Sequence, residues 1–194
     1  MDYTTELITR IGQQVVELVK ETLPTEGEGT GIVEVETQIR EILRQIGAVA
    51  LGQYLSARSG EVAPTIACGC GGELVYQRQR EASLISVFGR VSYQRSYYAG
   101  CSCGKGQAPL DQKLGLKAGG ISAGLAELLA LGGIELAFEQ GQRWLQKYLL
   151  FTISENTIRS ATETRGAQRQ AQEEAWRKQS QNEGWLQARL RSHG

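Results

Sequence analysis

Four cysteines in two matched pairs constrain the fold of this chain more than any other feature. Cys68 and Cys70 form the first pair and Cys101 and Cys103 the second, each with one residue between the cysteines and a glycine directly after the pair. Alternate residues of an extended segment point to the same face, so both thiolates of a pair can reach a single ion. Four thiolates complete a closed tetrahedral metal site. The pairs therefore predict one structural metal ion.

The segment between the two pairs is predicted to form a β-hairpin. Glu73–Arg80, Ser83–Phe88 and Val91–Tyr98 are rich in β-branched and aromatic residues, and Gly89-Arg90 is the predicted turn. A hairpin that brings two cysteine pairs together is the plan of a zinc ribbon, so zinc is the expected ion. Because four thiolates leave no open position for water or substrate, the predicted zinc is structural.

Two alternatives stay open for the cysteines, namely two disulfides or four small residues without a ligand. The first residues, Met1–Glu6, have no basic start and no apolar run, so nothing marks secretion, and cytosolic thiols stay reduced. The longest largely apolar run, Leu125–Phe138, is interrupted by glycines and glutamates and is too polar to span a bilayer. We therefore expect a soluble, cytoplasmic protein with no membrane partner.

Two amphipathic helices are predicted before the cysteines. Apolar residues recur at helical spacing from Thr5 to Leu23 and from about Ile32 to Ala57, on either side of a glycine-containing linker, Pro24–Gly31. The simplest arrangement is a hairpin in which the two helices pack on each other. The alternative is a homodimer, in which the apolar stripes pair with a second copy.

After the second cysteine pair, the pattern predicts three more helices. One begins at Ser122, its N-cap, and ends at Gly132-Gly133, and the next spans about Leu136–Leu149. Ser154 is the N-cap of the third. Helix, short turn and capped helix is the layout of a helix-turn-helix, whose second helix presents its first residues to base edges, although ordinary helical bundles share this pattern. The candidate base contacts are Ser154, Asn156, Thr157 and Arg159.

Arginines and tyrosines are interleaved on the predicted hairpin strands. Such a surface can meet phosphates and stack on bases, and the candidate contacts to double-stranded DNA are Arg78, Arg80, Arg90 and Arg95. The alternative is a solvated sheet face whose bases offset the charge of a four-thiolate centre. Residues 61–117 contain four acids and seven bases, whereas the whole chain has a net charge of zero. DNA binding would therefore depend on a local excess of positive charge.

We expect a mostly α fold with a small β zinc ribbon, in four segments. These are a helical hairpin at 1–58, the ribbon at 64–110, a helix-turn-helix-like domain at 118–166 and a polar connector helix at 167–194. The connector is rich in Gln, Ala, Glu and Arg and needs a partner, since its large apolar residues are few. They are Trp176, Trp185, Leu186 and Leu190. The single histidine, His193, is expected at a fraying terminus.

The order of these elements and several of their short sequence strings resemble the N-terminal part of bacterial insertion-sequence transposases of the Kra-type family. The resemblance covers about residues 60–190 and departs from the family pattern at the second cysteine pair, where two intervening residues are usual. It rests on the following strings: Cys68-Gly69-Cys70-Gly71-Gly72, Val87-Phe88-Gly89-Arg90-Val91, Arg95-Ser96-Tyr97-Tyr98, Cys101-Ser102-Cys103-Gly104-Lys105-Gly106, Pro109-Leu110-Asp111, Ala137-Phe138-Glu139-Gln140 and Ile153-Ser154-Glu155-Asn156-Thr157-Ile158-Arg159.

In that family these elements precede an RNase H-like domain whose acidic triad holds two metal ions for strand cleavage and joining. The resemblance therefore implies the DNA-recognition and assembly portion of a truncated or split transposase, with terminal repeats of the element as its DNA. A zinc-ribbon module that binds protein is the alternative. A catalytic site in this chain is not expected, because there is no phosphate-binding loop or H-E-x-x-H motif and just two aspartates, Asp2 and Asp111. Asp111 is assigned to a connector.

Overall fold

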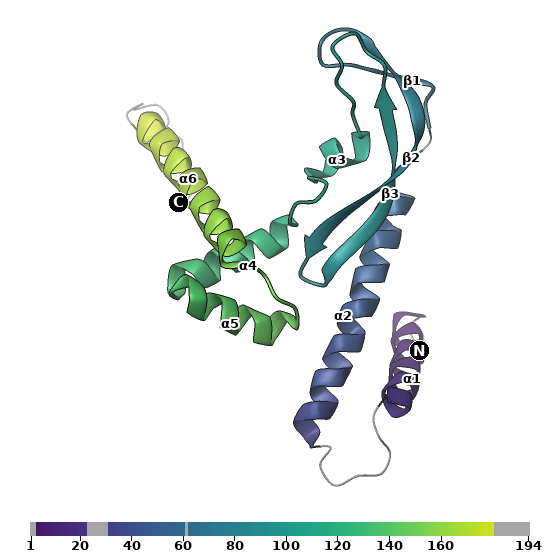
Figure 1. Ribbon diagram of the computed structural model, residues 1–194, viewed down its shortest axis with the longest axis vertical. Helices are drawn as coiled ribbons and strands as arrows, with labels where there is room; N and C mark the ends of the chain where they lie inside the picture. The colour runs from purple at the N-terminus through teal and green to yellow at the C-terminus, as the bar shows by residue number, and fades with distance from the viewer. Residues whose placement is uncertain (1–2, 23–30, 61, 181–194) are drawn as a thin grey trace, which may run out of the picture. The chain divides into compact units, whose positions relative to one another are not determined.

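A computed structural model describes residues 3–22, 31–60 and 62–180 (Figure 1). Some of the predicted features lie outside these ranges. They are the linker Pro24–Gly31, except for Gly31, and the residues Trp185, Leu186, Leu190 and His193. Contacts divide the chain into two units, residues 1–122 and 123–194. The described part contains six helices and one three-stranded sheet, which confirms a largely helical chain with a small sheet. Its elements are α1 (Tyr3–Thr22), α2 (Ile32–Ala57), β1 (Thr65–Ala67), β2 (Glu73–Ser86), β3 (Gly89–Ala99), α3 (Pro109–Leu114), α4 (Ala123–Glu135), α5 (Phe138–Leu149) and α6 (Glu155–Ser180).

The sheet is antiparallel throughout and has the strand order β1-β2-β3. β2 is one continuous strand where two were predicted, because Ala82 is buried opposite Tyr93 and keeps the middle of the strand in the ladder. The turn lies at Val87-Phe88, two residues before the predicted position. Buried Ser86 fixes it, since its Oγ accepts the Phe88 N–H at 3.0 Å and donates to the Gly89 carbonyl at 3.2 Å. β1 was not predicted.

At a β-bulge at Gln77, the buried side of β2 changes from one face of the sheet to the other. Tyr76 is opposite Tyr98 and Arg78 is opposite Tyr97. Because Tyr97 and Tyr98 are adjacent and point to opposite faces, Tyr76 and Arg78 also lie on opposite faces. Toward the cysteines, one face buries Leu74 and Tyr98 together with Cys68 and Cys101. Toward the hairpin turn, the other face buries Ala82, Leu84, Val91 and Tyr93 with Leu55 and Leu110. One ribbon therefore has two small cores on opposite faces.

α2 covers the outer edge of β3. The hydroxyl oxygens of Ser56 and Ser59 accept the Gln94 and Ser96 N–H groups at 2.9 and 3.0 Å. A Cβ at Gly52 would collide with the Ser92 carbonyl, so glycine permits this close approach. These contacts satisfy backbone groups that an exposed edge strand would leave open. The predicted helical hairpin and the predicted ribbon therefore form one folded unit, and no domain boundary separates them.

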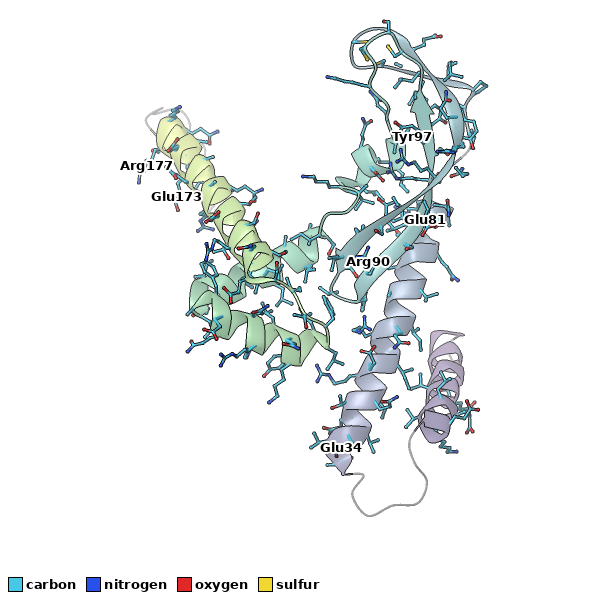
Figure 2. The ribbon with its side chains drawn as sticks, viewed as in Figure 1. Glu34, Glu81, Arg90, Tyr97, Glu173 and Arg177 are labelled. Carbon is cyan, nitrogen blue, oxygen red and sulfur yellow. The ribbon has the colours of Figure 1, made fainter. Side chains whose placement is uncertain are left out.

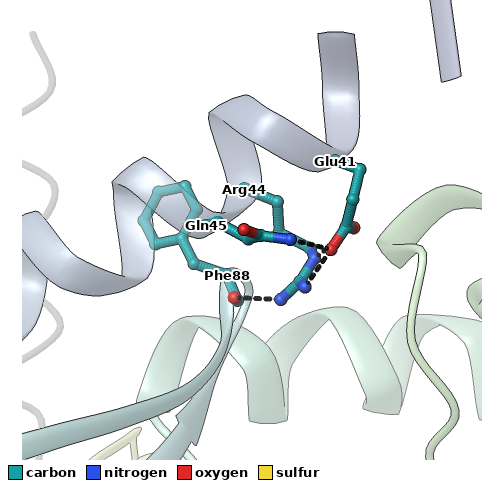
Figure 3. Close-up of polar contacts among 4 residues, drawn as sticks. All are labelled: Glu41, Arg44, Gln45 and Phe88. Atoms are coloured by element: carbon teal, nitrogen blue, oxygen red, sulfur yellow. Dashed lines mark hydrogen bonds and ion pairs between the residues drawn. The ribbon is translucent and has the colours of Figure 1, made fainter. Parts of the chain in front are cut away.

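The hairpin turn is also attached to α2 (Figure 3). The Arg44 guanidinium donates to the Phe88 carbonyl at 2.7 Å and to both carboxylate oxygens of Glu41. Gln45 donates to the same carboxylate at 2.8 Å. The Phe88 ring packs where a Cβ at Gly47 would lie 2.6 Å from ring atom Cδ1. The turn is thereby held by one charge-assisted contact and one apolar contact. α1 contacts α2 and buries Val15.

The second unit consists of α4, α5 and α6. α4 continues through Gly132-Gly133, which were expected to end it. A Cβ at Gly132 would lie 3.2 Å from Leu145, and one at Gly133 would collide with Thr162. The two glycines therefore permit close helix packing, and tertiary contacts overcome their low helix propensity. α6 runs without a break through the expected boundary at 166/167. In the described ranges we find no helix with the length and apolarity needed to cross a bilayer.

Candidate metal centre and nucleic-acid surfaces

Each cysteine pair lies on a tight turn rather than on the extended segment that we expected. The Gly71 N–H donates to the Cys68 carbonyl at 2.9 Å, and the Gly104 N–H donates to the Cys101 carbonyl at the same distance. Gly71 and Gly104 adopt φ values of 90° and 71°, which suit glycine. The two pairs therefore share one conformation, in which the cysteines occupy the first and third positions of a β-turn and glycine the fourth.

The two turns bring all four thiols together at one end of the ribbon, where Figure 2 shows the sulfur atoms in yellow. All four Sγ atoms lie within 4.8 Å of one another. The Sγ of Cys70 is 3.4 Å from that of Cys68 and 3.3 Å from that of Cys101. Ligands at 2.3 Å from a tetrahedral zinc ion are separated by about 3.8 Å. The four cysteines can therefore hold one metal ion, as predicted, and their thiols are free rather than joined in disulfides.

The thiol cluster lies directly on a small apolar core. Cys68 and Cys101 are buried, whereas Cys70 and Cys103 are exposed. Leu74 is fully buried, and the Tyr98 ring meets the Tyr76 ring edge to face with centroids 5.7 Å apart. A Cβ at Gly72 would lie 2.9 Å from the Cys101 sulfur, so a side chain here would displace a ligand. The core and Gly72 therefore position the thiols.

The four sulfur atoms influence each other's protonation. The Cys103 backbone N–H, followed by the Cys70 thiol, lowers the pKa of Cys101 to about 6. The Gly72 N–H lowers the pKa of Cys70, but the three neighbouring sulfur atoms outweigh it and the pKa is raised to about 12. Without a cation, the Cys101 thiolate is therefore favoured while the neighbouring Cys70 thiol keeps its proton. A bound cation would let both thiols ionise, because it stabilises several thiolates at once.

Arg78 and Arg80 lie exposed on one face of the sheet, between its two cores. Tyr97 is opposite Arg78, and the Arg80 guanidinium carbon lies 5.1 Å from the centre of the Tyr97 ring. The three side chains form a surface of two cations and one aromatic ring, which we call the ribbon arginine surface. Arg90 is exposed on the other face, near the hairpin turn, where it contacts Ser83 at 3.4 Å (Figure 2). The sheet therefore separates Arg90 from this surface.

Arg95 occupies a structural position rather than a surface one. Its side chain is 10% exposed and its Nη1 lies 2.8 Å from Asp111 Oδ2. Tyr93 donates its hydroxyl proton to the other oxygen of Asp111 at 2.9 Å. Asp111 belongs to α3 and not to a connector, so α3 is attached to β3 through two polar contacts. The prediction that Arg95 contacts DNA is replaced by this role, which sequence spacing did not reveal.

The contacts of Arg95 and Tyr93 with Asp111 were missed because Asp111 was assigned to a connector, and no local pattern indicates that it returns to β3. The sequence did contain a sign that Asp111 lies in a helix: it comes two positions after Pro109, and proline is favoured in the first turn of a helix. Burial, followed by the hydrogen bond to Asp111, raises the pKa of Tyr93 to about 12. The buried phenol therefore stays protonated well above its ordinary range.

The second unit places the candidate base contacts at the start of α6. Ser154 caps this helix as predicted, since its Oγ accepts the Thr157 N–H at 3.2 Å, and the two hydroxyls are 2.8 Å apart. The side chains of Ser154 and Thr157 are therefore bonded to each other at the cap of α6. Asn156 and Arg159 are exposed, and the Arg159 guanidinium carbon lies 5.2 Å from the centre of the Phe138 ring. Of the four candidates, these two take no part in the Ser154–Thr157 cap contacts.

The turn between α5 and α6 is fixed from both sides. Leu150 ends α5 in the left-handed region with a φ of 61°. Gln142 of α5 donates to the Ile153 carbonyl at 2.8 Å. Ile158 and Ala161 of α6 are buried, and α6 makes its main contacts with α4. The arrangement is a helix, a fixed turn and a capped helix supported by a third helix.

An apolar cavity between α4 and α5 was not predicted. It has a volume of about 350 Å³ and is lined by Leu128, Leu131, Gly132, Glu135, Leu136 and Trp144. Leu131 and Trp144 are 55% and 44% exposed, so the cavity opens on an apolar surface. Its signal in the sequence was the largely apolar run Leu125–Phe138, which we considered only as a possible membrane span.

Among the described residues, the four cysteines form the one group of metal-ligating side chains close enough to share an ion. Comparison of the sequence with models of known protein families and with curated proteins finds no match.

Proposed function

We propose that this chain binds double-stranded DNA as the recognition and assembly portion of an insertion-sequence transposase, the family that its sequence resembles. The observation that carries the proposal is the exposure of Asn156 and Arg159 near the start of α6, a helix that follows α5 after a fixed turn. In this proposal α6 reads base edges and the ribbon arginine surface contacts phosphates. Strand cleavage is assigned to no residue of this chain.

Two exposed side chains near the start of α6, Asn156 and Arg159, have the chemistry to read bases. An asparagine side chain can pair with adenine through two hydrogen bonds, and an arginine can pair in the same way with guanine. Asn156 and Arg159 are three residues apart, so they share one face of the helix. Buried Ile158 and Ala161 fix the rotation of α6 about its axis. This packing supports α6 as the helix that enters the major groove.

The ribbon arginine surface has the chemistry of a phosphate contact. Arg78 and Arg80 are exposed, and no acidic residue shares their face next to them in the strand register. Tyr97 holds Arg80 through its ring, which reduces the freedom lost on binding. Contacts of this kind position a protein on DNA without reading the sequence. We therefore assign orientation to the ribbon and sequence preference to α6.

The metal ion in this proposal is zinc. Soft thiolates favour zinc over magnesium or calcium, and four of them form a closed structural site. Cys68, Cys70, Cys101 and Cys103 would supply all four ligands. The ion would hold the two cysteine turns together and thereby fix the end of the ribbon beyond Arg78. Its contribution to DNA binding is indirect, through the fold.

Fluorescence anisotropy at several salt concentrations tests whether the ribbon arginine surface contacts phosphates while α6 determines sequence preference. The double variant Arg78→Gln/Arg80→Gln should weaken binding to every duplex and reduce the slope of log K against log salt by up to about 2, because each phosphate contact contributes about one unit. The double variant Asn156→Ala/Arg159→Ala should mainly reduce preference among duplexes selected from a random library. Arg177→Gln, at an exposed position near the end of α6, is the matched control and should change neither property.

Equal losses from both double variants would reject the division between ribbon and helix. Absence of binding by the zinc-loaded wild type at low salt, across the whole library, would reject DNA binding itself. The second candidate function, a module that binds protein, would then be favoured by the open apolar cavity between α4 and α5.

A further inference from the structure

We propose that the loop after the second cysteine turn positions the ribbon arginine surface, so that a metal ion in the cysteine site controls how tightly this surface binds DNA phosphates. The loop comprises residues 104–107, and Gly106 makes its contact with the surface. The inference rests on the proposed function in one respect, namely that the ribbon arginine surface binds phosphates. The positioning itself depends only on contacts within the ribbon.

Gly106 packs directly against the Tyr97 side chain. A Cβ at Gly106 would collide with the Tyr97 hydroxyl and would lie 2.5 Å from ring atom Cζ. The backbone of Gly106 lies outside the left-handed region, so glycine is needed here for space and not for its conformation. A larger residue at this position would therefore displace the tyrosine ring without straining the loop.

The loop is held at both of its ends. At one end, the Gly104 N–H donates to the Cys101 carbonyl at 2.9 Å and closes the second cysteine turn. At the other end, Gln107 and Tyr98 exchange two backbone hydrogen bonds of 2.8 and 2.9 Å, and Tyr98 belongs to the small core beside the thiols. Both supports of Gly106 are therefore parts of the cysteine end. Loss of the metal ion would loosen both.

Tyr97 connects the loop to Arg80. The ring is partly buried, and the exposed Arg80 guanidinium carbon lies 5.1 Å from its centre. Arg95 is directly opposite Arg80, but its charge is paired with Asp111, so Arg80 is free of a competing cation. A ring held in one place restrains the guanidinium that lies over it. The restrained side chain loses less freedom when it meets a phosphate, which increases affinity.

The contacts run without a gap from the second cysteine turn through Gly106 and Tyr97 to Arg80. A metal-free chain would keep the charges of Arg78 and Arg80 but would lose the arrangement of Arg80. Affinity for DNA would then rise with metal occupancy, although no metal ligand contacts DNA. Sequence preference, which we assign to α6 in the second unit, would stay the same.

NMR of the labelled chain without DNA tests the positioning. In the zinc-loaded wild type, the Tyr97 ring current should shift the Arg80 δ protons away from their position in Tyr97→Ala, which lacks the ring. Gly106→Ala should move these signals toward that position, with metal content unchanged. Gly69→Ala is the matched control, because an added Cβ in the first cysteine turn meets no atom within 4 Å. Unchanged Arg80 signals in metal-loaded Gly106→Ala would overturn the proposal.

Two further measurements do not depend on how Gly106→Ala folds. Tyr97→Phe removes the atom nearest to the added Cβ, so the double variant Gly106→Ala/Tyr97→Phe should recover part of the Arg80 shift. Removal of zinc from the wild type with a chelator should abolish the shift. The methyl signals of Val91, in the core at the hairpin-turn end, should then stay in place. An Arg80 shift that survives metal removal would overturn control by the metal.

Fluorescence anisotropy with a duplex of arbitrary sequence measures the effect on binding. Gly106→Ala should weaken binding about 3- to 10-fold, because one arginine is less restrained, and should leave preference among duplexes unchanged. Metal removal should weaken binding at least as much. Absence of binding by the zinc-loaded wild type would reject the proposed function. Wild-type affinity in a Gly106→Ala chain whose Arg80 signals have moved would instead overturn the control of affinity.

Discussion

The two ends of the β2–β3 ribbon are built from the same strands but are held by different means. At the hairpin-turn end, apolar residues from α2 and α3 pack on the sheet and serine hydroxyls close its edge. At the cysteine end, the buried core is limited to two apolar side chains and two thiols, and the turns converge on a site for one ion. Where a short segment lacks enough apolar surface to fold, a metal site can supply the missing stabilisation.

The largest expected effect separates the two ends. Cys70→Ser removes one of four ligands, so metal content should fall well below one ion per chain, and the cysteine end should lose its structure. Amide hydrogen exchange should rise sharply at Tyr98 and stay protected at Val91. Ser102→Ala, within the second cysteine turn but with no ligand atom, is the control. Equal loss of protection at both residues would mean that the ribbon folds as one unit.

The next effect is expected at the hairpin-turn end. Asp111→Ala leaves Arg95 buried without its partner and should reduce the free energy of unfolding by about 3 kcal/mol, as for other broken buried ion pairs. Metal content should stay at one ion per chain. Glu139→Ala removes one partner of the exposed pair with Arg143 and should cost less than about 1 kcal/mol. Chemical denaturation compares them, and loss of metal from Asp111→Ala would show that the two ends are coupled.

The two ends should also fail at opposite limits of pH. Protons compete with the metal for thiolates, so the cysteine end should release its ion as the pH falls. Tyr93 has its pKa raised from 10.0 to about 12, so the unfolded chain loses this proton first. Its stabilisation is complete below pH 10 and is lost as the pH rises through 12. Tyr93→Phe should abolish this alkaline dependence in denaturation measurements, whereas an unchanged profile would assign it to another group.

The smallest effect concerns the edge of β3. Ser56→Ala removes the acceptor of the Gln94 N–H, which should reduce the free energy of unfolding by about 1 kcal/mol. Ser160→Ala, at an exposed position of α6, should change it by less than half of this amount. Thermal unfolding of the two variants checks the difference. A result within error of the wild type for Ser56→Ala would mean that water replaces the hydroxyl at this edge.

Local chemistry made several elements predictable from the sequence. Matched cysteine pairs followed by glycine indicated a shared metal site, because buried free cysteines rarely occur as matched pairs and four thiolates complete a tetrahedral site. Ser154 was identified as a helix cap because the side chain of a capping residue bonds a backbone group three positions away. Apolar periodicity located α1, α2 and α5 to within a few residues, since one helical face must be buried.

The cysteine site, most of the helices and the presence of a hairpin could be predicted from the sequence, because each has a local signature: a cysteine pair followed by glycine, apolar residues at helical spacing, or a run of strand-forming residues. Tertiary structure alone decided the continuity of α4 through Gly132-Gly133, where packing against Leu145 and Thr162 outweighs the propensity of glycine. It also decided the role of Arg95. From the sequence alone, an arginine on a strand is interpreted as a surface cation. Arg95 is instead buried against Asp111, a carboxylate that lies next to it only because α3 packs on β3.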